Sequence, residues 1–195
     1  MTRKHHTSSV FVFGRPTGGW RIGLIRHPRL HRMTLPGGHV EDEESQAEAA
    51  LREVAEETGL MVTLVSPPAV PVPDGYRPVR VDPPWWIFEY QVPPDNHLGE
   101  AHVHIDHLYV ALADGTRAAA GPAHPFGWYT AADLDGLHMF DGARIMAASL
   151  LAALAAGEIR GDRAGGDRAG GDEAGGDEAR GDEARAARAL LAGLS

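Results

Sequence analysis

The chain has 195 residues, 43% of them hydrophobic, with a formal net charge of −9 and no cysteine. This size is enough for one ordinary core, and the lack of cysteine excludes disulfides, thiolate metal sites and a cysteine nucleophile. The acidic balance argues against a partner that is a nucleic-acid polymer, because such proteins carry clustered basic residues. No apolar run approaches transmembrane length, and Val10–Phe13 is too short for a signal core, so we expect a cytoplasmic protein without a membrane partner.

The first predicted elements are two strands joined by a turn. Val10–Phe13 and Trp20–Arg26 are rich in apolar residues, and the glycines and proline of segment 14–19 favour a hairpin connection between them. A short third strand is expected at Met33–Leu35, just before the pair Gly37-Gly38.

A helix with well-defined ends is predicted next. Ser45-x-x-Glu48 matches a capping box, in which a hydroxyl and a carboxylate satisfy free N–H groups at the start of a helix. Most residues from there to Thr58 are good helix formers, and Gly59 suits the left-handed position that ends a helix. The positions expected to form its buried stripe are Ala47, Ala50, Leu51, Val54 and Ala55.

Three glutamates occupy another face of this helix. Glu53, Glu56 and Glu57 are related by i,i+3 and i,i+4 spacing, so their side chains share one face. Like charges at this spacing destabilise a helix by roughly 0.2–0.5 kcal/mol per pair, a cost that makes sense where a divalent cation neutralises them. Carboxylate oxygens suit Mg²⁺ or Mn²⁺, which retain waters and bridge to substrate phosphates. The alternative is an ordinary solvated acidic face.

The segment from Gly38 to Leu60 follows one spacing pattern. Its sequence, GHVEDEESQAEAALREVAEETGL, fills every constrained position of G-x5-E-x7-R-E-U-x-E-E-x-G-U, where U is a bulky aliphatic residue. This pattern resembles the Nudix box, the signature of the Nudix hydrolases, and a chance match is far rarer than about one in a million at average residue usage. The absence of cysteine counts against the isomerase branch of that superfamily.

The resemblance implies a role for each charged residue of the box. The three glutamates would be catalytic and would hold Mg²⁺, with Mn²⁺ as a substitute, together with the backbone carbonyl of Gly38. Arg52 would keep the glutamates in place, with Glu44 as its charged partner. The alternative for Arg52 is a pair of simple helix salt bridges, because it lies four residues from both Glu48 and Glu56.

The later elements alternate between strands and a closing helix. We expect strands at Val62–Val65, Trp85–Val92, His102–Leu112 and Phe126–Tyr129, an irregular proline-rich loop at 66–84, a turn around Asp133 and Asp135, and a helix at Asp141–Ala156. Strands interleaved with two substantial helices predict an α/β fold of the α+β kind. The resemblance covers roughly residues 8–156 and implies a Nudix-type α/β/α sandwich with a mixed β-sheet.

Four residues outside the box are candidates for substrate binding. Arg26 is one of several basic residues suited to a phosphate, and Trp85 suits stacking on a base, with core and loop packing as the alternative. Glu100 is also a candidate metal ligand or general base, and its alternative is a surface glutamate. His104 is a candidate for contact with substrate or phosphate, with a structural role as the alternative.

His104 also belongs to a pattern with a metal-like composition. Alternation places His102, His104 and Asp106 on one face of the predicted strand. A second metal site is one interpretation, and a strand that simply packs against the core is the other.

The chain changes character after Gly157. Residues 161–185 are five near-copies of a pentad, GDRAG to GDEAR, with almost no large apolar side chains. Such a composition cannot offset the entropy of ordering, so we expect a Nudix domain at 1–157 and a disordered low-complexity tail at 158–195. The alternative for the tail is a tether that ends in a small docking segment at Ala184–Leu194.

Together these features predict a Mg²⁺-dependent Nudix hydrolase that cleaves the pyrophosphate bond of a nucleoside diphosphate linked to another moiety. One alternative is a nucleoside triphosphate pyrophosphohydrolase of the house-cleaning type. Another is a Nudix module that senses nucleotides without turnover. The expected partner is a small nucleotide-type substrate, and family precedent is compatible with a homodimer.

Overall fold

A mixed β-sheet forms the middle layer of the protein in the computed structural model, which describes residues 2–95, 97–118 and 121–160. At its centre β1 (Lys4–Gly14) runs parallel to β7 (His102–Ala113), from Lys4 opposite Val103 to Phe13 opposite Leu112. The other pairings are antiparallel. The remaining strands are β2 (Arg21–Arg26), β3 (Met33–Thr34), β4 (Gly37–His39), β5 (Val62–Val65), β6 (Trp86–Val92) and β8 (Phe126–Tyr129).

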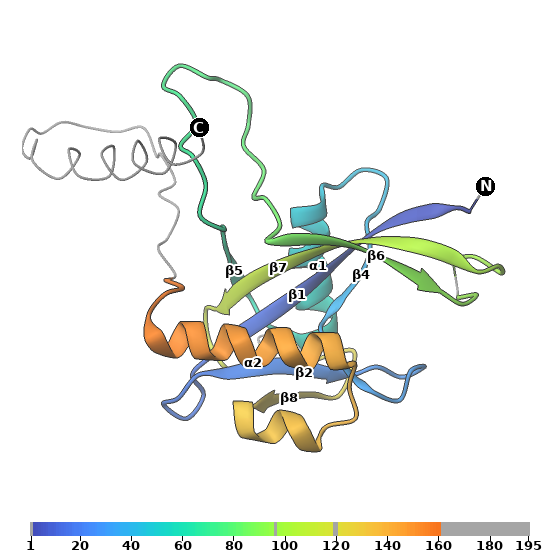
Figure 1. Cartoon of the computed structure of the whole chain (residues 1–195), viewed down its shortest axis with the longest axis vertical. Coiled ribbons are helices and arrows are strands. Elements are labelled where there is room, and N and C mark those ends of the chain that lie inside the picture. The colour runs from blue at the N-terminus through green and yellow to red at the C-terminus, as the bar shows by residue number, and fades with distance from the viewer. Residues whose placement is uncertain (1, 96, 119–120, 161–195) are drawn as a thin grey trace, which may run out of the picture. The chain divides into compact units, whose positions relative to one another are not determined.

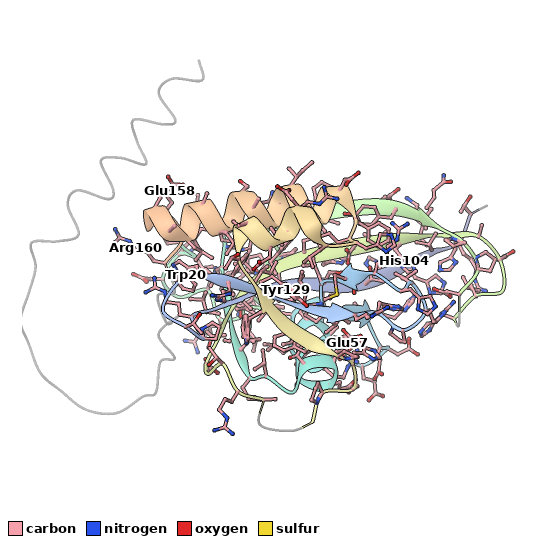
Figure 2. All side chains as sticks on the ribbon, turned by 90° about the horizontal axis from the view of Figure 1, so that it is seen from below. Trp20, Glu57, His104, Tyr129, Glu158 and Arg160 are labelled. Carbon is pink, nitrogen blue, oxygen red and sulfur yellow. The ribbon has the colours of Figure 1, made fainter. Side chains whose placement is uncertain are left out.

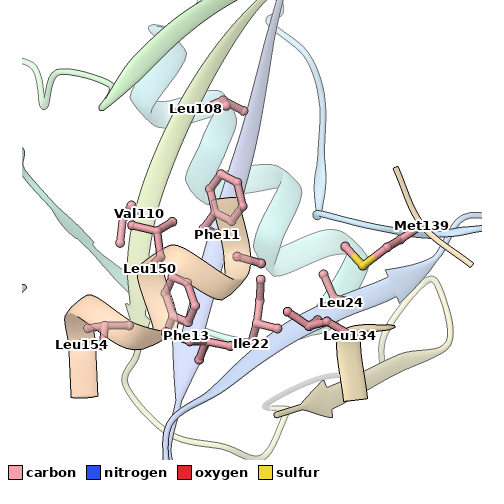
Figure 3. Packing of buried hydrophobic residues seen from close by; sticks show 12 residues of the cluster. Phe11, Phe13, Ile22, Leu24, Leu108, Val110, Leu134, Met139, Leu150 and Leu154 are labelled. Atoms are coloured by element: carbon pink, nitrogen blue, oxygen red, sulfur yellow. The ribbon is translucent and has the colours of Figure 1, made fainter. Parts of the chain in front are cut away.

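Two helices cover opposite faces of this sheet: α1 (Gln46–Thr58) and α2 (Asp141–Ala156) (Figures 1 and 2). The alternation of β1 explains both contacts, because successive side chains of a strand point to opposite faces. Val10 and Val12 pack on the α1 side, whereas Phe11 and Phe13 pack with leucines of α2 (Figure 3). The predicted α/β/α sandwich with a mixed β-sheet is confirmed.

The predicted ends of the acidic helix are confirmed. Ser45 and Glu48 form the reciprocal capping box, and Gly59 follows the helix with φ 69° in the left-handed region. The predicted stripe is partly wrong, because Leu51 is 40% exposed and Ala49 is buried in its place. Ala47, Ala50 and Val54 are buried as predicted, and Ala55 is half-buried.

Most predicted strands are confirmed within one or two residues, as are the helix at Asp141–Ala156 and the irregular loop at 66–84. Three features of the structure differ from the elements predicted from the sequence. β1 begins at Lys4 rather than Val10, β4 forms at the glycine pair, and the predicted turn around Asp133 is the 3-10 helix η1 (Ala131–Gly136). The predicted tail from residue 161 onward, with its docking alternative, lies outside the described residues.

Candidate active site

Two of the three box glutamates lie against the glycine pair of β4. The backbone N–H of Gly37 donates to Glu57 Oε2 at 2.9 Å, and a Cβ atom added to Gly38 would lie 2.2 Å from Glu53 Oε1. Glu56 instead reaches solvent, with 60% of its side chain exposed against 15% for Glu53. α1 and β4 therefore bring the carboxylates and the Gly38 backbone together.

Arg52 connects the acidic residues of the box. Its Nε and Nη2 atoms donate to both carboxylate oxygens of Glu44 at 3.0 and 2.7 Å. Its Nη1 atom donates to Glu53 at 2.9 Å and to Glu56 at 3.4 Å, and Nη2 also donates to the carbonyl of His39 at 3.0 Å. Because a guanidinium presents several donors in a rigid plane, it orients Glu53 beside β4 in a way that a lysine does not reproduce.

Burial changes the acid–base behaviour of these carboxylates. It raises the pKa of Glu57 from 4.5 to about 7; a backbone hydrogen bond opposes this rise, and the charges of Glu53 and Glu56 add to it. Burial also raises the pKa of Glu53 against the opposing effect of Arg52. Hydrogen bonds from Arg52 lower the pKa of Glu44. Burial and the neighbouring carboxylates therefore disfavour the charged forms of both Glu53 and Glu57.

A histidine from outside the box also reaches this group. His124 Nε2 lies 3.3 Å from Glu57 Oε1, because backbone hydrogen bonds from Ala123 and His124 hold their loop on the last carbonyls of α1. The ring of His27 is adjacent, at 6.2 Å between centroids. The sequence carries no local signal for His124, which stands among alanine, glycine and proline residues with no spacing relation to the box.

The four predicted substrate-binding residues occupy different elements. Arg26 is exposed at the end of β2, and Glu100 is exposed before β7. Trp85 packs on the α2 side of the sheet and donates its indole N–H to the carbonyl of Val65, which supports the packing alternative. His104 belongs to a group of histidines at the start of β7.

The predicted shared face of His102, His104 and Asp106 is confirmed, but the three side chains do not act as one group. His102 Nε2 lies 3.0 Å from His104 Nε2. Asp106 instead accepts hydrogen bonds from the hydroxyls of Thr7 and Ser9 at 2.9 and 3.1 Å. The two histidines are joined by His39 and Asp95, neither of which was among the predicted site residues.

Comparison with known proteins identifies relatives of this architecture. A family model described as the NUDIX domain matches residues 4–147. The chain is similar to a hydrolase of the NUDIX family from Clostridium perfringens, with 26% sequence identity, a TM-score of 0.60, and coverage of 78% of this chain and 99% of that one. It is similar in fold to a C. elegans Ap4A hydrolase in a binary complex, with 15% identity, a TM-score of 0.52, and coverage of 78% and 98%.

The comparison with curated proteins gave no match. Within the described part of the chain, no helix is both long and apolar enough to span a membrane.

Proposed function

Because the chain belongs to the Nudix family, we propose that it is a Mg²⁺-dependent enzyme acting on a nucleoside diphosphate linked to another moiety. Members of this family are hydrolases that cleave pyrophosphate bonds and generally use divalent metal ions. One observation carries this proposal. Glu53 and Glu57 converge on the Gly37-Gly38 backbone, next to an exposed Glu56.

The residues present fit a hard divalent cation. The donors are carboxylate oxygens and the Gly38 carbonyl, and such oxygens suit Mg²⁺ or Mn²⁺ better than softer metals. Gly38 has no Cβ, and the close approach of Glu53 leaves no room for one. Burial and the neighbouring carboxylates raise the pKa values of Glu53 and Glu57, so their ionised forms need nearby positive charge. A cation at this position would supply that charge.

The reaction follows from what these side chains do. Bound Mg²⁺ would screen the diphosphate, lower the pKa of a water and stabilise the departing phosphoryl oxygen. Arg52 orients Glu53, and the Gly37 N–H orients Glu57. Glu56, the exposed member of the set, would accept a proton from the attacking water. Glu100, exposed before β7, is the alternative acceptor.

The group attached to the diphosphate must be recognised by residues outside the Nudix box. The box contacts only the diphosphate, so selectivity must come from the segments around it: the loop at 66–84, the connection to β7 and the region of Trp128. A nucleoside triphosphate is the second candidate substrate, because its diphosphate presents the same chemistry to the box. A sensor without turnover is disfavoured, because every box carboxylate is retained.

A substrate panel tests the proposal. Purified protein is incubated with Mg²⁺ and dinucleotides, nucleotide sugars or nucleoside triphosphates, and products are identified by phosphorus NMR. Cleavage of a linked diphosphate gives a nucleoside monophosphate and the phosphorylated second moiety, whereas a triphosphate gives monophosphate and pyrophosphate. Tight binding without products indicates the sensor. No binding and no cleavage with either Mg²⁺ or Mn²⁺ contradicts the proposal.

A further inference from the structure

Four side chains at the start of β7 converge on one point: His39 of β4, His102 and His104 of β7, and Asp95 of the connection between β6 and β7. We call this group the histidine cluster. One ligand-type atom of each residue lies within 4.8 Å of the others. His102 is fully buried, and the side chains of Asp95 and His104 are 18% and 19% exposed.

The spacing of these atoms matches a tetrahedral metal site. Four ligands at about 2.0–2.2 Å from Zn²⁺ are separated from one another by about 3.3–3.6 Å. Asp95 Oδ2 lies 3.4 Å from His102 Nε2, 3.6 Å from His104 Nε2 and 3.9 Å from His39 Nε2. The two Nε2 atoms of β7 are 3.0 Å apart. Each of these four distances lies within about 0.3 Å of the tetrahedral range, and every pair of ligand atoms in the set lies within 4.8 Å.

Hydrogen bonds outside the histidine cluster orient its members inward. His102 Nδ1 lies 2.9 Å from the carbonyl of Glu100, which only accepts, so Nδ1 carries the proton and Nε2 presents a lone pair to the cluster. Asp95 Oδ1 accepts from the backbone N–H groups of His97 and Leu98 at 2.8 and 2.9 Å, which leaves Oδ2 facing the histidines. Metal-binding histidines and carboxylates are held by such outer partners.

Hydrogen bonds within the histidine cluster cannot give each of its four ligand atoms a partner. His102 Nε2 and Asp95 Oδ2 are both acceptors, and His104 Nε2 can donate its one proton to only one of them. His39 Nε2 is buried and has no hydrogen-bond partner among the described residues. A cation at the centre would satisfy all four atoms at once.

The histidine cluster lies on the face of the sheet away from α1. Gly38 pairs with Ser8, whose hydroxyl donates to the carbonyl of Gln46 in α1. His39 is the next residue and pairs with Thr7, so it points to the other face. In Figure 2, α1 and Glu57 lie on the lower side of the sheet. The cluster is therefore separate from the box carboxylates.

We propose that His39, Asp95, His102 and His104 form a structural Zn²⁺ site that ties β4 and the β6–β7 connection to β7. Three imidazoles favour Zn²⁺ over Mg²⁺, a carboxylate oxygen can complete the zinc coordination, and four protein ligands close the site against substrate. The ring of His97 stacks on His39 at 3.7 Å between centroids. A hollow of about 370 Å³ lies beside the site and is lined by His5, His39 and His97 among other residues.

The site also restrains the catalytic side of the fold. His39 follows Gly38 directly, and its carbonyl accepts a hydrogen bond from Arg52 at 3.0 Å. A zinc ion that fixes His39 thereby limits movement of β4 under the box carboxylates. This inference does not depend on the substrate or on Mg²⁺ binding by the box.

Zinc content and cobalt spectroscopy test the site. Protein without an affinity tag is loaded with Zn²⁺, desalted in excess Mg²⁺ to occupy hard oxygen ligands, and measured by elemental analysis. The variants are His104→Gln and Asp95→Asn, with His138→Gln, an exposed histidine outside the cluster, as control. Replacing Zn²⁺ by Co²⁺ in the wild type reports coordination directly, because tetrahedral cobalt absorbs visible light far more strongly than octahedral cobalt.

We expect about one zinc ion per chain in the wild type and the His138→Gln control, and intense cobalt absorption. His104→Gln and Asp95→Asn should weaken zinc binding at least about 100-fold, since even outer partners contribute 10–100-fold. Zinc should raise the melting temperature of the wild type and the His138→Gln control, but not that of the two cluster variants. Wild-type protein without zinc, weak octahedral cobalt absorption, or zinc retained by both variants would overturn the inference. The wild-type cobalt spectrum decides the question even if a variant fails to fold.

Discussion

Replacing Glu57 with glutamine should stabilise the protein in the absence of metal while removing its capacity to bind Mg²⁺ at the box. Burial raises the pKa of Glu57 from 4.5 to about 7. At about 1.4 kcal/mol per pH unit, the ionised carboxylate costs the folded state on the order of 3 kcal/mol above pH 7. Glutamine keeps an oxygen that can accept a hydrogen bond from the Gly37 N–H, and it carries no charge. The free energy of unfolding of the variant should therefore exceed that of the wild type by about 2–3 kcal/mol.

The difference in stability between the wild type and Glu57→Gln should depend on pH. Below pH 4.5 the carboxyl is protonated in both the folded and unfolded states, so wild type and Glu57→Gln should be equally stable. Between pH 4.5 and about 7 the folded wild type retains a proton that the unfolded chain has released, so its stability falls relative to the variant as pH rises. Above about pH 7 the full difference is present.

Urea unfolding with EDTA at pH 4 and pH 8 measures this difference, and the melting temperature of Glu57→Gln at pH 8 should be higher by about 5–10 °C. The exposed Glu43→Gln is the matched control and should change stability by less than about 0.5 kcal/mol. Saturating Mg²⁺ should stabilise the wild type but not the variant, because the ligand binds only the folded site. A variant less stable than wild type at pH 8 in EDTA would refute the reasoning.

Four further outcomes are expected. Glu56→Gln should lower kcat at least about 100-fold, as loss of a general base does, while its urea midpoint stays at the wild-type value because the side chain is 60% exposed. Arg52→Lys should lose the paired contact with Glu44 and destabilise the protein by about 1–3 kcal/mol in urea titrations; unchanged stability would show that those bonds contribute nothing. Gly38→Ala should displace Glu53 and weaken Mg²⁺ binding measured by calorimetry, whereas Gly19→Ala, where an added Cβ meets open space, should not. Calorimetric Mg²⁺ affinity should rise with pH up to about 7, because Glu57 must release its proton; a flat profile would exclude Glu57 as a ligand.

The acidic helix could be predicted from the sequence because its determinants are local. The capping residues Ser45 and Glu48, the terminal Gly59 and the i,i+4 spacing of the glutamates all lie within one short segment. The first half of β1 could not be predicted, because Lys4–Ser9 is polar and shows no apolar alternation. Its strand conformation comes from pairing with β4 and β7, which are distant in sequence.

The same distinction separates the predicted site residues from those that were missed. Arg52 lies four residues before Glu56, so their contact follows from helix geometry. His124 reaches Glu57 only because its loop hydrogen-bonds to the end of α1. Asp95 meets His102 because the connection from β6 folds back on β7. Tertiary pairing places these groups, and no local pattern marks them.

The most direct test of the account is binding of Mn²⁺, observed by electron paramagnetic resonance, with the histidine cluster first filled with Zn²⁺. Wild-type protein should hold Mn²⁺ that Mg²⁺ displaces, and a variant with glutamine at Glu53, Glu56 and Glu57 should leave the ion free in solution while remaining folded. Equal Mn²⁺ binding by the wild type and this variant would contradict the assignment of the box carboxylates as the metal site.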